Sequence, residues 1–443
     1  MPNIPVFKGN KDRCALLVGR TWKTVATLLG KCLESCLLSI MGAKYSFLFL
    51  IICWMGCTTR NGEGQEKLAT QSLTSPAKSE SGEPLLFTTL DSTVYLSWLE
   101  INGSKTSLKY SSLDGGQWST PATIASGDHW FVNWADFPAM AVNGKSLLAH
   151  YLDTEGEGNY SYNIKIVTSI DGGTVWSGPL GLHDDKKQAE HGFVSILPYE
   201  NGFFVTWLDG RNTVMEGMEE MKGHEGHHGA MSLRAAILDA AGNKLNEWEL
   251  DNKTCDCCQT SAAITTSGPV VVYRDRSDQE IRDISIVRYI DGKWTAPMSI
   301  HDDQWKINGC PVNGPRIAAH GNDLAIAWYS AAADSAKVHI IFSSDAGASF
   351  GKAIRVDEGN TLGRVDVELL SREIAVVSWM EGTQIKAVKV HSDGTKEPSW
   401  TIATTSEARS SGFPQMTRSG NRLIFAWTDD GEKQVKIASL LLE

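Results

Sequence analysis

An eight-residue turn sequence recurs along this chain and restricts the folds open to it. Residues 169–176 read Ser-x-Asp-x-Gly-x-x-Trp, and residues 111–118 and 343–350 are close copies. An aspartate in such a turn accepts bonds from backbone N–H groups just downstream, and glycine accepts a positive φ. The aromatic residue folds back over the turn and adds apolar area. The pattern predicts a tight strand-to-strand turn, and weaker copies occupy residues 238–242, 290–294 and 392–394.

The turns alternate with short strands that carry an aromatic residue near their end. β-branched and aromatic residues fill these strands, and clusters of Gly, Asn, Asp and Ser separate them. A period of about 50 residues in an all-β chain is the signature of a β-propeller with one four-stranded blade per repeat. The aromatic anchors, spaced 48 to 66 residues apart, are Trp98, Tyr151, Trp207, Tyr273, Trp328, Trp379 and Trp427.

The array of turns resembles the Asp boxes of the sialidase-like β-propellers, over about residues 83–443. Sialidases have six blades, but seven anchored strands favour seven blades of four strands here, with six as the alternative if one unit is an insertion. The last unit, residues 410–443, holds only three strands. We therefore expect the segment 71–76 to supply its outer strand and close the ring.

The N-terminal region differs in character from the rest. Residues 41–57 combine a basic start, an apolar run of about ten residues and a final Gly-Cys, which is too short to span a bilayer as a stop-transfer helix. The segment resembles a bacterial lipoprotein signal, with Cys57 as the lipid-bearing residue, although Trp54 stands where a small aliphatic residue is expected. A plain signal peptide and a cytoplasmic extension are the alternatives.

The resemblance to a lipoprotein signal sets the expected domain boundaries. We expect residues 1–40 to be an upstream misreading, residues 58–80 a polar tether, and residues 81–443 a single propeller domain. The mature protein is then exported and anchored by lipid in the bacterial outer membrane or at the cell surface, as a monomer. A net charge of −11 argues against a nucleic-acid partner.

Propeller geometry sorts the loops between two faces. The recurring turns share one rim, whereas the loops that begin each inner strand open on the opposite face around the central channel. We expect a glycan or another small ligand at that channel mouth. Its tryptophans suit stacking on sugar rings or packing between blades equally well. The ligand-face residues are Asp128, His129, Trp130, Trp134, His191, Trp305 and Asn313.

The sialidase resemblance implies three arginines that hold a sialic acid carboxylate, a Tyr/Glu nucleophile pair and an Asp acid/base. The first inner strand begins Glu83-Pro84 in place of the family's Arg-Ile-Pro motif, and no residues are assigned to the Tyr/Glu pair. Structural salt bridges would explain the arginines and aspartates of this face as well. The candidate catalytic residues are Asp136, Arg274, Arg276, Arg364, Asp366 and Arg409.

Two groups on the same face have the side chains of metal sites. Cys255, Cys257 and Cys258 precede one inner strand and Cys310 precedes the next, so we expect them to be neighbours. They are joined in disulfides, bind copper(I) or zinc, or remain unpaired thiols. A loop rich in soft ligands suits copper or silver, or is a solvated loop that binds metal only adventitiously. Its residues are Met215, Met218, Met221, His224, His227 and His228.

The sequence therefore predicts an all-β, lipid-anchored propeller of the sialidase-like class. Its leading function is that of a cell-envelope protein that acts on or binds glycans, as an exo-α-sialidase-like glycoside hydrolase. The alternatives are a non-catalytic propeller that binds a ligand or copper, and a scaffold for protein interactions, because fold does not fix function.

Overall fold

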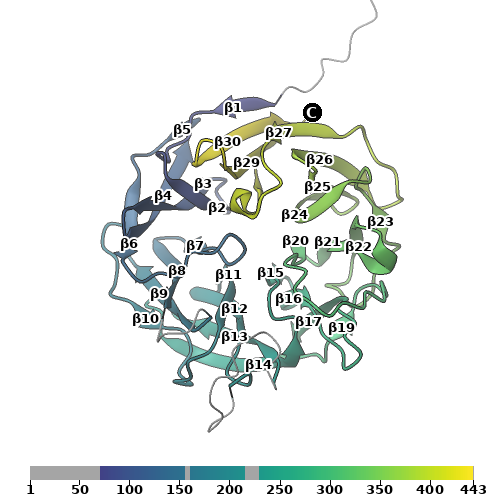
Figure 1. The fold of residues 1–443 in the computed structure, drawn as a ribbon, viewed down its shortest axis with the longest axis horizontal. Coiled ribbons are helices and arrows are strands. Elements are labelled where there is room, and N and C mark those ends of the chain that lie inside the picture. The colour runs from purple at the N-terminus through teal and green to yellow at the C-terminus, as the bar shows by residue number, and fades with distance from the viewer. Residues whose placement is uncertain (1–69, 155–159, 215–228, 443) are drawn as a thin grey trace, which may run out of the picture. The chain divides into compact units, whose positions relative to one another are not determined.

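The computed structural model describes residues 70–154, 160–214 and 229–442, which form seven β-sheets. Figure 1 shows the sheets as the blades of a propeller, arranged in a ring around a common centre. The prediction of an all-β propeller with seven blades is confirmed, and the six-blade alternative is wrong. The helices within these ranges are two single 3-10 turns, η1 (Ala332–Asp334) and η2 (Arg409–Ser411), and none there has the length and apolarity to cross a membrane.

The first three blades follow one another along the chain, each antiparallel and each starting at the channel. The first blade consists of β2 (Ser81–Thr88), β3 (Val94–Asn102), β4 (Lys105–Asp114), β5 (Gln117–Trp118) and β6 (Ala122–Gly127), with β5 and β6 both paired to β4. The second consists of β7 (Met140–Asn143), β8 (Ser146–Thr154), β9 (Tyr162–Ser169) and β10 (Leu180–Gly181). The third consists of β11 (His191–Tyr199), β12 (Gly202–Asp209), β13 (Met231–Leu238) and β14 (Lys244–Thr254).

The next three blades repeat this arrangement. The fourth consists of β15 (Ser261–Thr265), β16 (Gly268–Arg274), β17 (Ile284–Ile290), β18 (Lys293–Trp294) and β19 (Met298–Ser299). The fifth consists of β20 (Arg316–His320), β21 (Asp323–Ser330), β22 (Lys337–Ser343) and β23 (Ile354–Arg355). The sixth consists of β24 (Thr361–Ser371), β25 (Ile374–Glu381), β26 (Gln384–His391) and β27 (Trp400–Thr404).

The seventh blade joins the two ends of the ring. It consists of β28 (Gln415–Ser419), β29 (Arg422–Asp429), β30 (Gln434–Leu441) and, as its outer strand, β1 (Gln71–Leu73). In Figure 1 the purple β1 lies beside the yellow β30. The prediction that the chain preceding the first blade closes the ring is confirmed. Residues 71–73, which the sequence placed in the polar tether, therefore already belong to the propeller.

The aromatic anchors occupy the second strand of every blade. Four of them, Trp98, Trp207, Trp328 and Trp379, are at most 1% exposed. A buried indole N–H needs an acceptor, and each of these donates to a carboxylate. Trp98, Trp207 and Trp379 donate to Glu100 at 3.0 Å, Asp209 at 2.9 Å and Glu381 at 2.6 Å, each two residues further along the same strand. Trp328 donates to Asp303 at 2.7 Å, in the loop before its blade. The repeat thus provides an apolar core residue together with the acceptor that its burial requires.

The recurring turn joins the third and fourth strands of a blade. In the copy between β22 and β23, Asp345 accepts bonds from the Ser343 hydroxyl at 2.8 Å and the Ser349 backbone N–H at 2.9 Å. The Ser343 hydroxyl in turn accepts the N–H of Gly347 at 3.0 Å, where φ is +80° and glycine is favoured. The aspartate is therefore occupied by the turn itself.

Replacing Asp345 with alanine should loosen this turn without affecting the opposite face. Losing its charge-assisted bonds is expected to lower the melting temperature by about 2–4 °C. Asp345→Asn keeps one acceptor oxygen and should lose less, which thermal unfolding of both variants would measure. Equal melting temperatures for wild type and Asp345→Ala would contradict this role.

Candidate functional site

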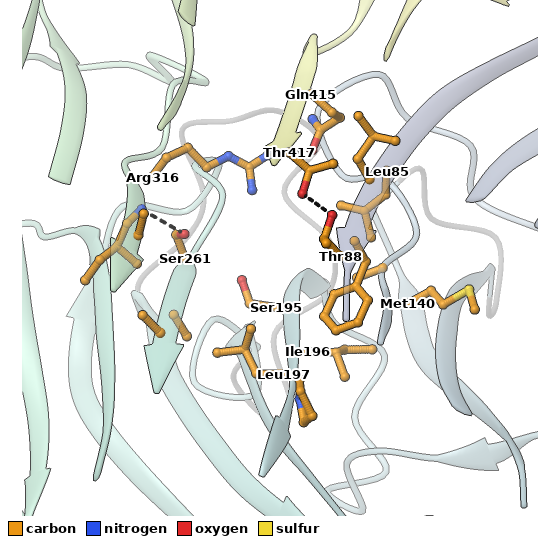
Figure 2. Close-up of a pocket in the computed structure, with 18 of the residues that line it drawn as sticks. Leu85, Thr88, Met140, Ser195, Ile196, Leu197, Ser261, Arg316, Gln415 and Thr417 are labelled. Atoms are coloured by element: carbon orange, nitrogen blue, oxygen red, sulfur yellow. Dashed lines mark hydrogen bonds between the residues drawn. The ribbon is translucent and has the colours of Figure 1, made fainter. Parts of the chain in front are cut away.

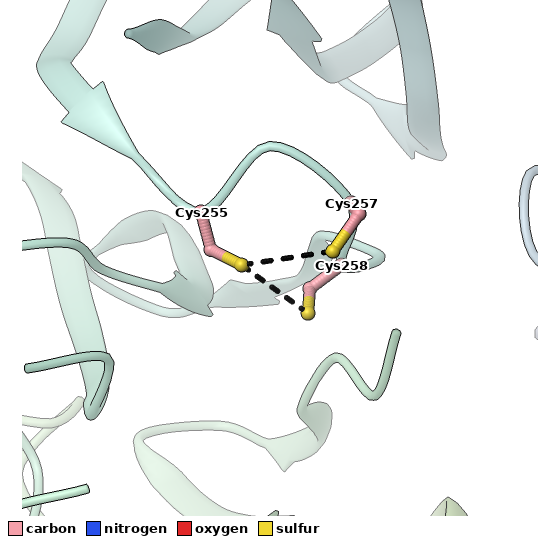
Figure 3. Close-up of side chains that lie close together, drawn as sticks. All are labelled: Cys255, Cys257 and Cys258. Carbon is pink, nitrogen blue, oxygen red and sulfur yellow. Dashed lines mark hydrogen bonds between the residues drawn. The ribbon is translucent and has the colours of Figure 1, made fainter. Parts of the chain in front are cut away.

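Three cysteine side chains converge in the loop between β14 and β15 (Figure 3). The sulfur of Cys255 lies 3.6 Å from that of Cys258 and 3.9 Å from that of Cys257. Both separations far exceed the roughly 2.05 Å of a disulfide bond. Cys310, in the loop between β19 and β20, interacts through its thiol with Cys257. The two loops thus bring four free thiols together, and we call these four residues the thiol cluster.

The thiol cluster is buried at one end and exposed at the other. Cys255 and Cys258 are at most 2% exposed, Cys257 is half-buried and Cys310 is exposed. At the buried end the Arg282 guanidinium donates to the Cys255 sulfur at 3.3 Å. The buried end therefore already holds a cation where negative charge on sulfur would develop.

Burial and neighbouring groups shift the pKa values of the cluster thiols in different directions. Burial opposes ionisation of Cys255, but hydrogen bonds from Cys257 and Cys258 and the charge of Arg282 outweigh it and hold its pKa well below the usual range. Burial raises the pKa of Cys258 to about 12. The contact with Cys257 lowers the pKa of Cys310 to about 7. Thiolate, the form that binds metal, is thus favoured at both the deepest and the most exposed position.

The spacing of the sulfurs fits a shared metal ion. Ligand atoms of Cys255, Cys257 and Cys258 all lie within 4.8 Å of one another. A metal about 2.3 Å from each sulfur would separate the sulfurs by about 3.8 Å in tetrahedral and about 4.0 Å in trigonal coordination. The measured 3.6 and 3.9 Å lie close to both values. A set of sulfur donors alone suits copper(I) and zinc.

Arg274 and Asn313 form hydrogen bonds that hold the loops around the thiol cluster in place. The Arg274 guanidinium is 1% exposed and donates to the backbone carbonyls of Asn313 at 2.8 Å, Arg282 at 2.7 Å and Tyr329 at 2.7 Å. Asn313 donates its backbone N–H to the Cys258 sulfur at 3.4 Å. Arg274 therefore fixes the two loops that carry Arg282 and Asn313 against the cysteines.

A second group on this face centres on Trp134. Its ring stacks on Phe413 at 5.6 Å, and the guanidinium of Arg364 lies 5.1 Å from its centroid. Arg364 is 6% exposed and donates to the carbonyls of Gly412, Glu407 and Ala408. Burial, and then the charge of Arg409, lower the Arg364 pKa to about 10. Arg409 is exposed and lies 5.8 Å from the Trp134 ring.

A tyrosine, a glutamate and an aspartate meet beside the second blade. The Tyr162 hydroxyl donates to Glu190 at 2.7 Å and lies 3.3 Å from Asp136, which also accepts the Phe193 backbone N–H at 2.7 Å. Burial raises the pKa of Asp136 to about 8 and that of Glu190 to about 7. Tyr162 is 1% exposed and its ring stacks on Phe131 at 4.2 Å. Sequence analysis did not identify Tyr162 and Glu190 as a pair, because they lie 28 residues apart in segments that share no motif.

His191 lies in a buried network between the second and third blades. Its Nε2 is 3.1 Å from Asp185 and 3.6 Å from Asp209, and its ring stacks on His183 at 3.6 Å. Arg211 binds Asp209 at 2.7 Å. His183, Asp185 and His191 have metal-ligand spacing, but Arg211 already supplies a cation there.

The other predicted residues lie in separate surroundings. Arg276 pairs with Asp256 and Glu280, each at 3.0 Å, and Asp366 is half-buried and accepts the backbone N–H of Met416 at 2.7 Å. Trp305 lies under Arg274 at 4.8 Å, and Trp130 stacks on Tyr151 at 4.1 Å. The two remaining ligand-face predictions, Asp128 and His129, are exposed beside Trp130.

Seven predicted residues lie outside the described ranges and stay predictions. They are the lipidation residue Cys57 and the soft-ligand loop residues Met215, Met218, Met221, His224, His227 and His228.

The central channel is a separate cavity of about 940 Å³. Figure 2 shows apolar side chains such as Leu85 and Ile196 on its wall together with polar ones such as Ser195 and Thr417. Glu368 also lines it, and burial, reinforced by the nearby Asp366, raises the Glu368 pKa to about 8. None of the four cysteines lines this cavity, so the thiol cluster and the channel are distinct sites.

The raised pKa of Glu368 predicts a pH dependence of stability. Between the unfolded-state value of about 4.5 and the folded value of about 8, the folded protein holds a proton that the unfolded chain has released. Stability is therefore expected to fall as pH rises from 5 to 8, and Glu368→Gln should reduce that slope by up to about 1.4 kcal/mol per pH unit. Urea unfolding at pH 5, 6.5 and 8 tests this, with the exposed Glu373→Gln as control. Equal slopes for wild type and Glu368→Gln would overturn it.

Comparisons with known proteins identify the architecture. A scan against protein-family models finds no match, and neither does a search of curated proteins. Among solved structures, the polysaccharide lyase Uly1 is similar with a TM-score of 0.51 at 9% identity, covering 82% of this chain and 90% of that one. A mutant of the NanB sialidase from Streptococcus pneumoniae gives 0.43 at 9%, covering 84% and 94%. An α-L-arabinanase from Penicillium chrysogenum, solved with arabinobiose, gives 0.44 at 11%, covering 84% and 98%.

At these identities the similarity is one of fold. The similarity to Uly1 agrees with the predicted propeller fold. The chain is a seven-bladed β-propeller, and its chemistry has to be argued from its own side chains.

Proposed function

We propose that this protein is an exported, lipid-anchored propeller that binds a soft metal ion, copper(I) foremost, through Cys255, Cys257 and Cys258. The observation that carries the proposal is the convergence of three sulfurs within 4.8 Å of one another on one loop, with two of them buried. The lipid anchor at Cys57 belongs to the proposal and rests on the lipoprotein-like segment 41–57.

The surroundings favour copper(I) over zinc. Three thiolates around a monovalent ion leave a net negative charge, and Arg282, 3.3 Å from Cys255, offsets it without donating an electron pair to the metal. Zinc prefers four ligands, but the sulfurs that all lie within 4.8 Å of one another are those of Cys255, Cys257 and Cys258, and Cys310 is not among them. Soft thiolate ligands select copper(I) at low coordination number.

Metal analysis of protein purified without oxygen tests the proposal. We expect one copper(I) per chain after loading and a first coordination shell of sulfur in X-ray absorption. The Cys255→Ser/Cys257→Ser/Cys258→Ser variant should bind none, and zinc offered alone should bind more weakly. No bound metal together with no free thiols would show that the cysteines are joined in disulfides and would overturn the proposal.

A second candidate function, action on a glycan, is favoured by the group of Tyr162, Glu190 and Asp136. These are the three residue types that the sialidase resemblance implies for the nucleophile, its partner and the acid/base. The exposed Arg409 beside Trp134 offers a cation and an aromatic surface for an acidic sugar. Against it, Tyr162 is buried, and Arg274 and Arg364 already donate to backbone carbonyls.

The second candidate is tested with a fluorogenic sialoside. Turnover by wild type that is lost in both Tyr162→Phe and Glu190→Gln would support it. Absence of turnover by a folded wild-type protein would remove hydrolysis of sialosides from consideration, and it would leave the metal proposal unaffected.

A further inference from the structure

The four thiols of the cluster differ in exposure in a regular order. Cys310 is exposed, Cys257 is half-buried and interacts with Cys310, and Cys255 and Cys258 are buried with sulfurs 3.6 Å apart. For the three-sulfur copper(I) set proposed above, Cys310 is a further thiol that interacts with one member of the set without belonging to it. The sulfurs form a series that runs from the exposed Cys310 to the buried Cys255 and Cys258.

Charge changes along the same series. At the exposed end, the carboxylates of Asp256 and Glu190 lie close enough to Cys310 and to each other to influence each other's ionisation. At the buried end, Arg282 contacts Cys255 at 3.3 Å. The guanidinium stabilises the anionic complex that forms when a cation reaches the buried thiolates. The carboxylates at the exposed end are already engaged, Asp256 with Arg276 at 3.0 Å and Glu190 with Tyr162 at 2.7 Å.

We propose, resting on the metal-binding function above, that Cys310 is the exchange ligand through which copper(I) passes between this protein and a second copper(I) carrier with thiolate or thioether ligands. One copper–sulfur bond to Cys310 forms as one bond to the donor's ligand breaks. Bonds to Cys257 and the buried pair then replace the remaining donor bonds, and the bond to Cys310 breaks as the last of the three resident bonds forms. Copper stays in the +1 state, so the step requires no oxidant or reductant. Each thiol that becomes a ligand releases its proton to solvent or to a leaving ligand.

Exchange kinetics distinguish this role from that of a resident ligand. Protein is loaded with the copper(I)–glutathione complex, and release is followed by stopped-flow absorbance with bathocuproine disulfonate; the affinity is measured separately by competition. For Cys310→Ser we expect the exchange rate to fall at least tenfold more than the affinity does. Cys310→Met, which restores a soft ligand at the same place, should recover most of the rate, whereas a structural role for the thiol would not produce such recovery.

The outcomes separate the two proposals. Wild-type protein that binds no copper(I) removes both the proposed function and this inference. Wild-type binding with an unchanged exchange rate in Cys310→Ser overturns the inference alone. Equal losses of rate and affinity also overturn it, because they make Cys310 a resident fourth ligand.

Discussion

Replacing Cys255 with serine is expected to weaken copper(I) binding on the order of 1000-fold, or about 4 kcal/mol. Cys255 is the sulfur that both Cys258 and Cys257 face, at 3.6 and 3.9 Å, and it is the one that Arg282 contacts. A serine hydroxyl is a hard, protonated oxygen at neutral pH and a poor ligand for a soft ion. Its removal leaves two sulfurs and an arginine whose charge no longer faces a thiolate.

Competition against a copper(I) chelator measures this affinity. Ser232→Ala, a fully buried hydroxyl in the neighbouring third blade, is the control for packing changes and should bind as wild type does. Circular dichroism would establish that both variants keep the propeller. A loss of less than tenfold in Cys255→Ser would mean that the metal, if bound, is held elsewhere.

The fold could be predicted from the sequence because a propeller repeats its local chemistry. Turns such as 343–350 and anchors such as Trp379 each form their bonds within one blade, so a single copy already indicates the local structure. The closure of the ring by β1 could also be predicted, because the last repeat unit of the sequence contains only three strands. Several strands contain Trp-x-Glu or Trp-x-Asp, and in the structure the indole N–H of such a Trp donates to that carboxylate. The spacing alone did not indicate that the two side chains bond.

The site was less predictable because it depends on loops without a repeat. Topology places Cys255–Cys258 and Cys310 at the starts of successive inner strands, so that their neighbourhood was an expectation from the sequence. The direction in which each arginine side chain points could not be predicted from the sequence. Arg364 has a φ of +52°, and its guanidinium extends to the carbonyls of η2 and its flanks. The Arg282 guanidinium faces a sulfur, and Arg274 binds the Arg282 backbone carbonyl at 2.7 Å.

Replacing Arg274 with methionine is expected to cost about 3–5 kcal/mol of unfolding free energy. The side chain is 1% exposed and donates to three backbone carbonyls from three different segments, those of Asn313, Arg282 and Tyr329. Methionine fills a similar volume but offers no donor, so three buried acceptors lose their partner at about 1–3 kcal/mol each when nothing replaces it. Urea denaturation at fixed pH would measure the loss.

Arg276→Met is the matched control. Arg276 lies two residues along the chain and forms ion pairs with Asp256 and Glu280, but its side chain is 22% exposed, so its loss should cost at most about 1 kcal/mol. If Arg274 instead bound a substrate carboxylate, as the sialidase resemblance implies for an arginine of this face, Arg274→Met would leave the unfolding free energy near that of the control and would lower only glycan binding. A large loss of stability in Arg274→Met alone would identify this arginine as the residue that holds the loops of the thiol cluster together.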